Sequence, residues 1–218
     1  MNWDWTARNA DLITSYTLAH LWLAGAPTVI GLALAIPLGA FAQRRRWAYP
    51  PTVTIAGLLY TVPSIAVFVL LPGLIGTSIL DPVNVVVALT LYTVALMVRT
   101  VADALAAVPQ EVRQAAVAMG FRPVRRLVAV ELPIAVPVIG AGLRVAAVSN
   151  VSLVAVAALI GVPQLGQLFT KGQQMDFYTP IIVGIVACAA IAVVFDAIIV
   201  TAVRVATPWR RAEAAART

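Results

Sequence analysis

Charged residues are scarce in this sequence. Only 11% of its 218 residues are Asp, Glu, Lys or Arg, whereas 61% are hydrophobic, and the mean hydropathy is +0.95. A soluble domain carries about 25% charged residues. The composition therefore excludes an ordinary soluble protein. It predicts an all-α, polytopic membrane helix bundle in which residues 1–218 form one domain.

Cysteine and histidine are nearly absent. Cys188 is the single cysteine and lies in an apolar run, which excludes an internal disulfide and a metal site built from cysteines. His20 is the single histidine, and there is no metal-ligand spacing, so we expect no metal site. No Ser-His-Asp set is evident either. We interpret His20 as an interfacial residue near the outer end of the first span. Because no nucleophile–base pair is evident, an intramembrane enzyme is disfavoured.

A phosphate-binding loop is also missing. Gly161 and Gly166 have the glycine spacing of the pattern G-x-x-x-x-G-K-[ST], but Gln167 stands where lysine is required. The chain is therefore not expected to bind ATP by this means. We expect no cofactor in this chain and no enzymatic activity of its own.

The sequence consists mainly of long apolar runs. A bilayer core needs about 20 apolar residues per helical span, and about five runs meet that length. We place the spans at about 17–41, 52–75, 83–105, 134–160 and 179–205. Asp4 and Asp11 precede the first run, where a secretory signal peptide would need positive charge.

The positions of the basic residues set the orientation. With the N-terminus outside and the C-terminus in the cytoplasm, the external segments hold only Arg8 and Lys171. The cytoplasmic segments hold Arg44, Arg45, Arg46, Arg113, Arg122, Arg125, Arg126, Arg210, Arg211 and Arg217. This is a clear positive-inside bias. The net charge of +6 therefore reflects orientation in the lipid bilayer, and we expect no nucleic-acid partner.

The loop at residues 109–131, between the third and fourth spans, predicts a short amphipathic helix. Its apolar stripe has the spacing i, i+3, i+4 and i+7 and consists of Val112, Ala115, Ala116 and Met119. Pro109 suits the first helical position, Glu111 favours the positive end of the helix dipole, and Gly120 can close the C-terminus in a left-handed conformation. A helix this short needs a docking partner.

The same loop resembles the signature loop of ABC importer permeases. Gln114-Ala115-Ala116, Gly120, Val130 and Leu132-Pro133 match its spacing without a gap, with Gln114 in place of Glu and Val130 in place of Ile. The resemblance implies a coupling helix that docks on a cytoplasmic ATPase. The implied coupling residues are Glu111, Gln114, Ala115, Ala116, Met119, Gly120, Arg122, Arg125, Leu132 and Pro133.

That resemblance also implies partners and a location. We expect a type I importer fold in the inner membrane of a bacterium, a cytoplasmic ABC ATPase dimer that binds ATP and Mg, a second permease chain, identical or homologous, and an extracytoplasmic substrate-binding protein. Arg122, Arg125 and Arg126 are interpreted equally well as positive-inside charges or as contacts to the ATPase.

Further stretches resemble the permeases for quaternary-amine osmoprotectants. They include Tyr60-Thr61-Val62-Pro63-Ser64, Ala141-Gly142-Leu143-Arg144 and Ala158-Leu159-Ile160-Gly161; Val162-Pro163-Gln164 departs from the pattern. The implied function is alternating-access import of glycine betaine, choline, carnitine or proline betaine. The alternatives are a permease for another small solute such as an amino acid, and an ion-coupled secondary transporter, which would need midplane ionisable residues or inverted repeats.

Polar and aromatic residues inside the spans are candidates for the substrate pathway. They are Tyr60, Pro63, Ser64, Tyr92, Ser149, Asn150 and Ser152. Helix packing explains them about as well, since intramembrane Asn usually bonds across a helix interface. Tyr60 or Tyr92 could offer a cation–π face to a quaternary ammonium.

Two further charges lie within spans, where an unpaired charge is costly. We expect Arg144 to have a structural role, paired with Asp103, Glu131 or Asp196, and we expect Asp196 to form a structural ion pair.

Overall fold

The computed structural model describes residues 3–45 and 47–209, and within them every regular element is a helix. Short helices and long spans alternate along the chain. The elements are α1 (Trp3–Arg8), α2 (Ala10–Arg44), α3 (Tyr49–Thr61), α4 (Ser64–Ile75), α5 (Pro82–Ala106), α6 (Gln110–Ala118), α7 (Pro123–Arg126), the π-helix η1 (Leu127–Glu131), α8 (Leu132–Val156), the 3₁₀-helix η2 (Ala157–Ile160), α9 (Gly166–Gln174) and α10 (Tyr178–Ala206).

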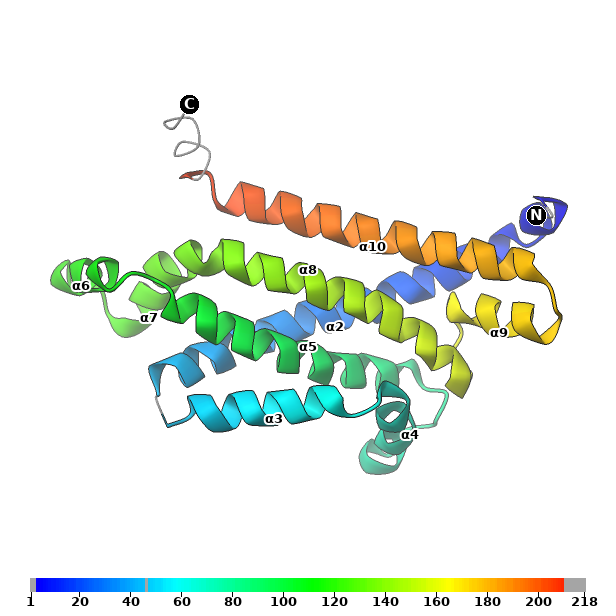
Figure 1. The fold of residues 1–218 in the computed structure, drawn as a ribbon, viewed down its shortest axis with the longest axis horizontal. Helices are drawn as coiled ribbons and strands as arrows, with labels where there is room; N and C mark the ends of the chain where they lie inside the picture. The colour runs from blue at the N-terminus through cyan, green and yellow to red at the C-terminus, as the bar shows by residue number, and fades with distance from the viewer. Residues whose placement is uncertain (1–2, 46, 210–218) are drawn as a thin grey trace.

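The long helices α2, α5, α8 and α10 run along the length of the molecule (Figure 1). Helices α6 and α7 lie at one end, together with the end of α2 and the start of α3. The N-terminal helix α1, α4 and α9 lie at the opposite end. The arginines that close α2 are therefore at the same end as α6 and α7, which agrees with the predicted orientation. Arg46, Arg210, Arg211 and Arg217 lie outside the described residues.

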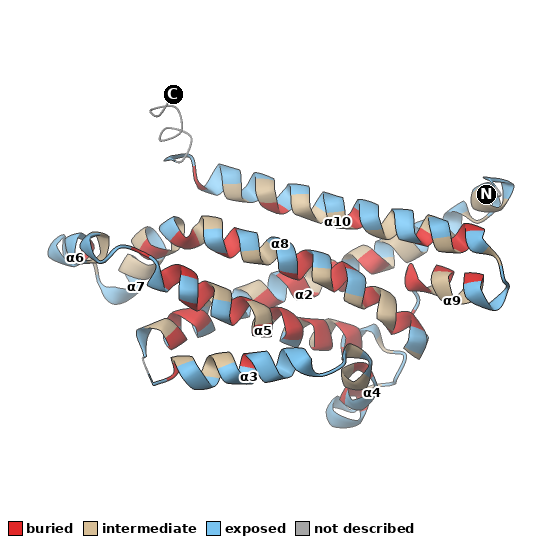
Figure 2. Cartoon of the chain, in the orientation of Figure 1, coloured by how far each residue is buried: buried red, intermediate tan, exposed pale blue. Residues whose placement is uncertain are grey.

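Helices α2 and α5 form the centre of the bundle, and α2 presents glycine where α5 comes closest. A methyl group on Gly31 would lie 2.5 Å from the side chain of Thr93, and one on Gly39 would lie 2.7 Å from Val101. Small residues allow this close packing because membrane helices associate through van der Waals contact and not through exclusion of water. Figure 2 shows α5 as the most buried of the long helices, whereas α10 is exposed over most of its surface.

Within residues 3–45 and 47–209, four helical segments are long and apolar enough to cross a membrane, and the predicted second span is not among them as one continuous helix. Its two halves, α3 and α4, are bent by 102°. Val62 is extended (φ −68°, ψ 130°), as the residue before Pro63 must be, and Pro63 has no N–H to continue the helix. The predicted span at 52–75 is therefore a broken one. Counting the bent pair once gives the five spans expected.

The helix that contains the predicted fourth span begins before residue 134, because helical structure is continuous from Pro123 to Ile160 over 38 residues. A π-turn lies within it at η1, where the N–H of Leu132 donates to the carbonyl of Leu127. Pro133 supplies the reason for the irregularity, since it has no N–H for the preceding turn. The predicted start at residue 134 thus corresponds to the end of this turn and not to the start of the helix.

Candidate functional site

The loop between α5 and α8 folds into helix α6, a tight turn and the short helix α7. Pro109 precedes the first residue of α6, and Glu111 lies in its first turn, where the helix dipole favours an acidic side chain. The predicted helix is therefore confirmed, with its start one residue later than the proline.

Gly120 ends α6 in the left-handed conformation that the sequence predicted, with φ +79°. The N–H of Phe121 donates to the carbonyl of Ala116 (3.1 Å), and the N–H of Gly120 donates to the carbonyl of Val117 (2.9 Å). This pair of hydrogen bonds is a Schellman motif, which satisfies carbonyl groups at the helix end. The guanidinium of Arg125 lies 4.9 Å from the centre of the Phe121 ring and covers the turn.

Two arginines tie this segment to the neighbouring spans α2 and α5, and a third braces its junction with α8. A guanidinium nitrogen of Arg113 donates to the carbonyl of Leu105 at the end of α5. Arg44, the last residue of α2, donates to the carbonyl of Pro123 (2.8 Å). Arg126 pairs with Glu131 (2.7 Å), whose side chain is 3% exposed. The segment is therefore in direct contact with the ends of α2 and α5 and continues through η1 into α8.

The apolar stripe predicted for α6 divides between two surfaces. Ala116 is 1% exposed and packs within the chain, and Val112 is partly buried. Ala115 is exposed, and Met119 is 69% exposed. Val117 and Val124 add exposed apolar side chains at the same end of the molecule. The surface open to a partner is therefore the face with Ala115 and Met119, and Ala116 holds the helix on its own bundle.

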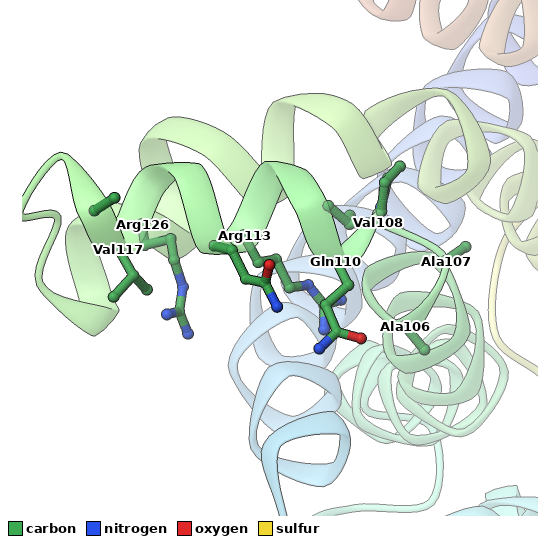
Figure 3. Close-up of a pocket in the computed structure, with 10 residues that line it drawn as sticks. Ala106, Ala107, Val108, Gln110, Arg113, Val117 and Arg126 are labelled. Carbon is green, nitrogen blue, oxygen red and sulfur yellow. The ribbon is translucent and has the colours of Figure 1, made fainter.

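An open hollow of about 890 Å³ lies between the end of α5 and helix α6 (Figure 3). Gln114, the residue that replaces the signature glutamate, lines it. The charged side chains that line it are Arg113 and Arg126; Arg126 is paired with Glu131, so Arg113 supplies the uncompensated positive charge. A carboxylate from another protein would complement this charge, because an Arg fork favours carboxylate oxygens.

The remaining predicted coupling residues have different surroundings. Glu111 and Arg122 are exposed. Leu132 packs against the core cluster that contains Met97 and Leu105. Pro133 is the second residue of α8 and follows the π-turn. Leu132 and Pro133 therefore lie where the segment joins the span, and both are partly buried.

The structure brings four of the predicted pathway residues together. Tyr60, Tyr92, Ser149 and Asn150 line one small void, with Thr93 completing the polar part of its wall. Three others lie elsewhere: Pro63 is exposed at the break between α3 and α4, Ser64 begins α4, and Ser152 is exposed on α8.

The structure also tests the expectations for the charged residues within the spans and for His20. Arg144 on α8 pairs with Asp196 on α10 through two hydrogen bonds, of 2.5 and 3.0 Å, so the predicted ion pair is confirmed.

The interpretation of His20 as an interfacial residue is wrong, because its side chain is fully buried. Its ring nitrogens lie 3.1 Å from Oε1 of Gln164 and 3.0 Å from the carbonyl of Val151. The hydropathy pattern of α2 gave no sign of a polar partner for His20.

Comparison with known proteins identifies this architecture. Residues 31–211 match the family described as the binding-protein-dependent transport system inner membrane component. The chain belongs to this family. The match includes α6, α7 and every long helix from α3 onward, so the membership rests on the whole bundle and not on the signature loop alone. It also confirms the predicted multi-pass membrane protein and the resemblance on which the coupling segment was assigned.

Relatives within this group are transport permeases. The chain is 36% identical to the osmoprotectant import permease protein OsmW of Salmonella typhimurium over 191 residues, 86% of this chain and 88% of that protein. It is 28% identical to the choline transport system permease protein OpuBB of Bacillus subtilis, with coverage of 88% and 87%. A chain of the inward-facing MetNI methionine ABC transporter superposes with a TM-score of 0.82 at 19% identity, covering 92% of this chain and 98% of that one. The fold is therefore that of an ABC importer permease.

Proposed function

We propose that this chain is the permease subunit of an ATP-driven importer for a small osmoprotectant in the inner membrane of a bacterium. One observation carries the proposal. The α6–α7 segment is exposed at one end of the bundle, is tied by Arg44 and Arg113 to α2 and α5, and continues through η1 into α8. A partner that moves this segment moves the spans with it.

The partner in this proposal is a cytoplasmic ATPase dimer that binds ATP and Mg. Its surface would receive Ala115 and Met119, and an acidic side chain would enter the hollow between Arg113 and Arg126. ATP binding would close the ATPase dimer and shift α6, and the bundle would then alternate between outward-open and inward-open states. Short helices with an exposed apolar face gain stability mainly from such docking.

Two further partners complete the proposed importer. A second permease chain, identical or homologous, would cover part of the exposed surface of the bundle, since a pore needs walls on all sides. An extracytoplasmic substrate-binding protein would deliver the solute to the end that carries α1, α4 and α9. The family description supports dependence on such a protein.

The substrate class rests on the relatives. One of them is described as an osmoprotectant import permease protein and another as a choline transport system permease protein. A third, of Bacillus subtilis, is described as a glycine betaine/carnitine/choline transport system permease protein. We therefore propose glycine betaine, choline, carnitine or proline betaine as the solute.

The test is uptake into proteoliposomes that contain this chain, its partner permease, the ATPase and the binding protein. We expect accumulation of labelled glycine betaine, choline or carnitine with ATP at the ATPase side and none without ATP. ATP hydrolysis with no uptake of any of these solutes would reject the osmoprotectant assignment. Uptake that does not depend on ATP would favour a secondary transporter.

A further inference from the structure

The geometry points to a binding site for a quaternary ammonium group inside the membrane, formed by Tyr60, Tyr92 and Asn150. This inference rests on the proposed function and places the solute in the bundle. Tyr60 is about 17 Å along α3 from its cytoplasmic start, and Tyr92 is about 15 Å along α5 from its outer start, at a rise of 1.5 Å per residue. The cluster therefore lies near the middle of the bilayer.

The orientation of the Asn150 amide is fixed by its neighbours. Its Nδ2 donates to the hydroxyls of Thr28 and Thr93, both at 2.9 Å. Each hydroxyl already donates its own hydrogen to a carbonyl four residues earlier in its helix, at 2.8 Å, and can only accept from Asn150. The amide therefore cannot be reversed.

The carbonyl oxygen of Asn150 is consequently left as a spare acceptor. It receives no hydrogen bond from the described residues, although the side chain is 2% exposed. The fully enclosed side-chain atoms of the described residues that lack a partner do not include this oxygen, so it keeps some access to its surroundings. Asn150 lines the same void as the two tyrosines. A positive group in that void would be stabilised by this oxygen.

The two tyrosine rings provide a second source of negative potential. Their centroids are 5.9 Å apart and their planes meet at 84°, an edge-to-face arrangement. In this geometry the positive edge of one ring lies on the negative face of the other. A cation can take the place of the ring edge on that face. Tyr60 is 43% exposed and can move, whereas the Tyr92 hydroxyl is held by the carbonyl of Val62 (2.5 Å).

The helix end at the break after α3 is a third source of negative potential at the void. Tyr60 is in the last turn of α3, which ends at Thr61. The C-terminal end of a helix carries a partial negative charge, and interrupted membrane helices use such ends to hold cations at the midplane. The void is therefore surrounded by an amide oxygen, aromatic faces and a helix C-terminus.

These groups suit a quaternary ammonium better than a primary amine or a metal ion. A quaternary nitrogen has no N–H to donate and is recognised by aromatic faces. The residues that line the void include no carboxylate, so a cation would bind weakly and could leave. The void is too narrow to admit a water molecule in this structure, so it would have to widen to receive the group. Displacement of the Tyr60 ring would open it.

The test compares three variants at one exposed position in the reconstituted importer. Tyr60→Phe and Tyr60→Trp keep an aromatic face, and Tyr60→Leu removes it. We expect ATP-dependent uptake of choline or glycine betaine close to that of the unaltered complex for Phe and Trp. For Leu we expect a fall of about five- to thirtyfold, the range that a cation–π contact supports.

Two further measurements show whether a variant lowers uptake only because the complex is misfolded or unassembled. ATP hydrolysis stimulated by the loaded binding protein, and the amount of assembled complex, should stay within about twofold in all three variants. Equal uptake by Tyr60→Leu and Tyr60→Phe would overturn the site while leaving the importer assignment intact. No uptake by the unaltered complex would overturn the proposed function and the site together.

Discussion

Nδ1 of His20 lies 3.1 Å from Oε1 of Gln164, which joins α2 to the loop before α9. The same Gln164 oxygen accepts from the N–H of Gly166 (2.5 Å), so both residues are held in one buried network. Gln164 belongs to Val162-Pro163-Gln164, the stretch where the sequence departs from the osmoprotectant permeases. The structure gives that departure a reason, because Gln164 is the partner of His20.

Loss of either partner should destabilise the outer end of the bundle. Gln164→Leu leaves the Nδ1 of His20 and the N–H of Gly166 without this partner, and His20→Leu removes one of the two hydrogen-bond contacts of the Gln164 oxygen. Each should lower the free energy of unfolding by about 1–3 kcal/mol. The double variant should be less destabilised than the sum of the two singles, because each single already removes the shared contact. Thermal unfolding in detergent measures all three. Thr14→Ala is the control, since its exposed hydroxyl bonds only within its own helix; strictly additive effects would contradict the pairing.

Arg144 and Asp196 should behave as one unit. Removing either alone leaves a charge within a span, so Arg144→Ala and Asp196→Ala should each reduce the yield and the unfolding temperature of the inserted protein. Arg144→Asp combined with Asp196→Arg keeps the pair with its charges exchanged and should recover most of the loss. A swapped protein no better than the single variants would show that a third group fixes these charges.

Substitutions at Gly120 distinguish the need for a left-handed backbone at this turn from the need for an uncharged docking surface. Nothing lies within 4 Å of a methyl group placed there, so a side chain meets no clash, but the φ of +79° disfavours most residues. Asn and Asp both tolerate this conformation. We expect Gly120→Asn to keep most ATP-dependent uptake and Gly120→Asp to abolish it while membrane insertion is retained. Gly120→Val should lower uptake through backbone strain of about 1–2 kcal/mol. Equal uptake by Asn and Asp variants would contradict a docked turn.

The Tyr92 hydroxyl fixes the broken end of α3. Tyr92→Phe removes its hydrogen bond to the carbonyl of Val62 and should loosen the junction with α4 while keeping the aromatic ring. We expect faster hydrogen exchange at residues 60–66 and a modest fall in uptake, less than that of Tyr60→Leu. Tyr178→Phe, on an exposed residue at the start of α10, is the matched control. Unchanged exchange at the junction would show that Pro63 alone sets the bend.

Much of the architecture could be predicted from the sequence because hydropathy, arginine placement and helix-end residues act locally. Gly120 and the Arg144–Asp196 pair followed from such rules: a left-handed helix end favours glycine, and a charge within a span needs a partner. The 102° bend at Pro63 did not, since a proline in a span either kinks a helix or breaks it, and packing decides which. The burial of His20 also depends on a residue 144 positions away, a contact that no local pattern reveals.

The central claim is that the α6–α7 segment is the surface that contacts the ATPase. Met119 is 69% exposed in that segment, and Cys188 is the only cysteine in the chain. In a Cys188→Ala background, Met119→Cys should form a covalent permease–ATPase adduct when the complex is treated with a short thiol-to-amine cross-linker. Tyr178→Cys, at the opposite end of the molecule, should not. Adducts from Tyr178→Cys alone, or none from Met119→Cys in a complex that still copurifies with its ATPase, would contradict the account.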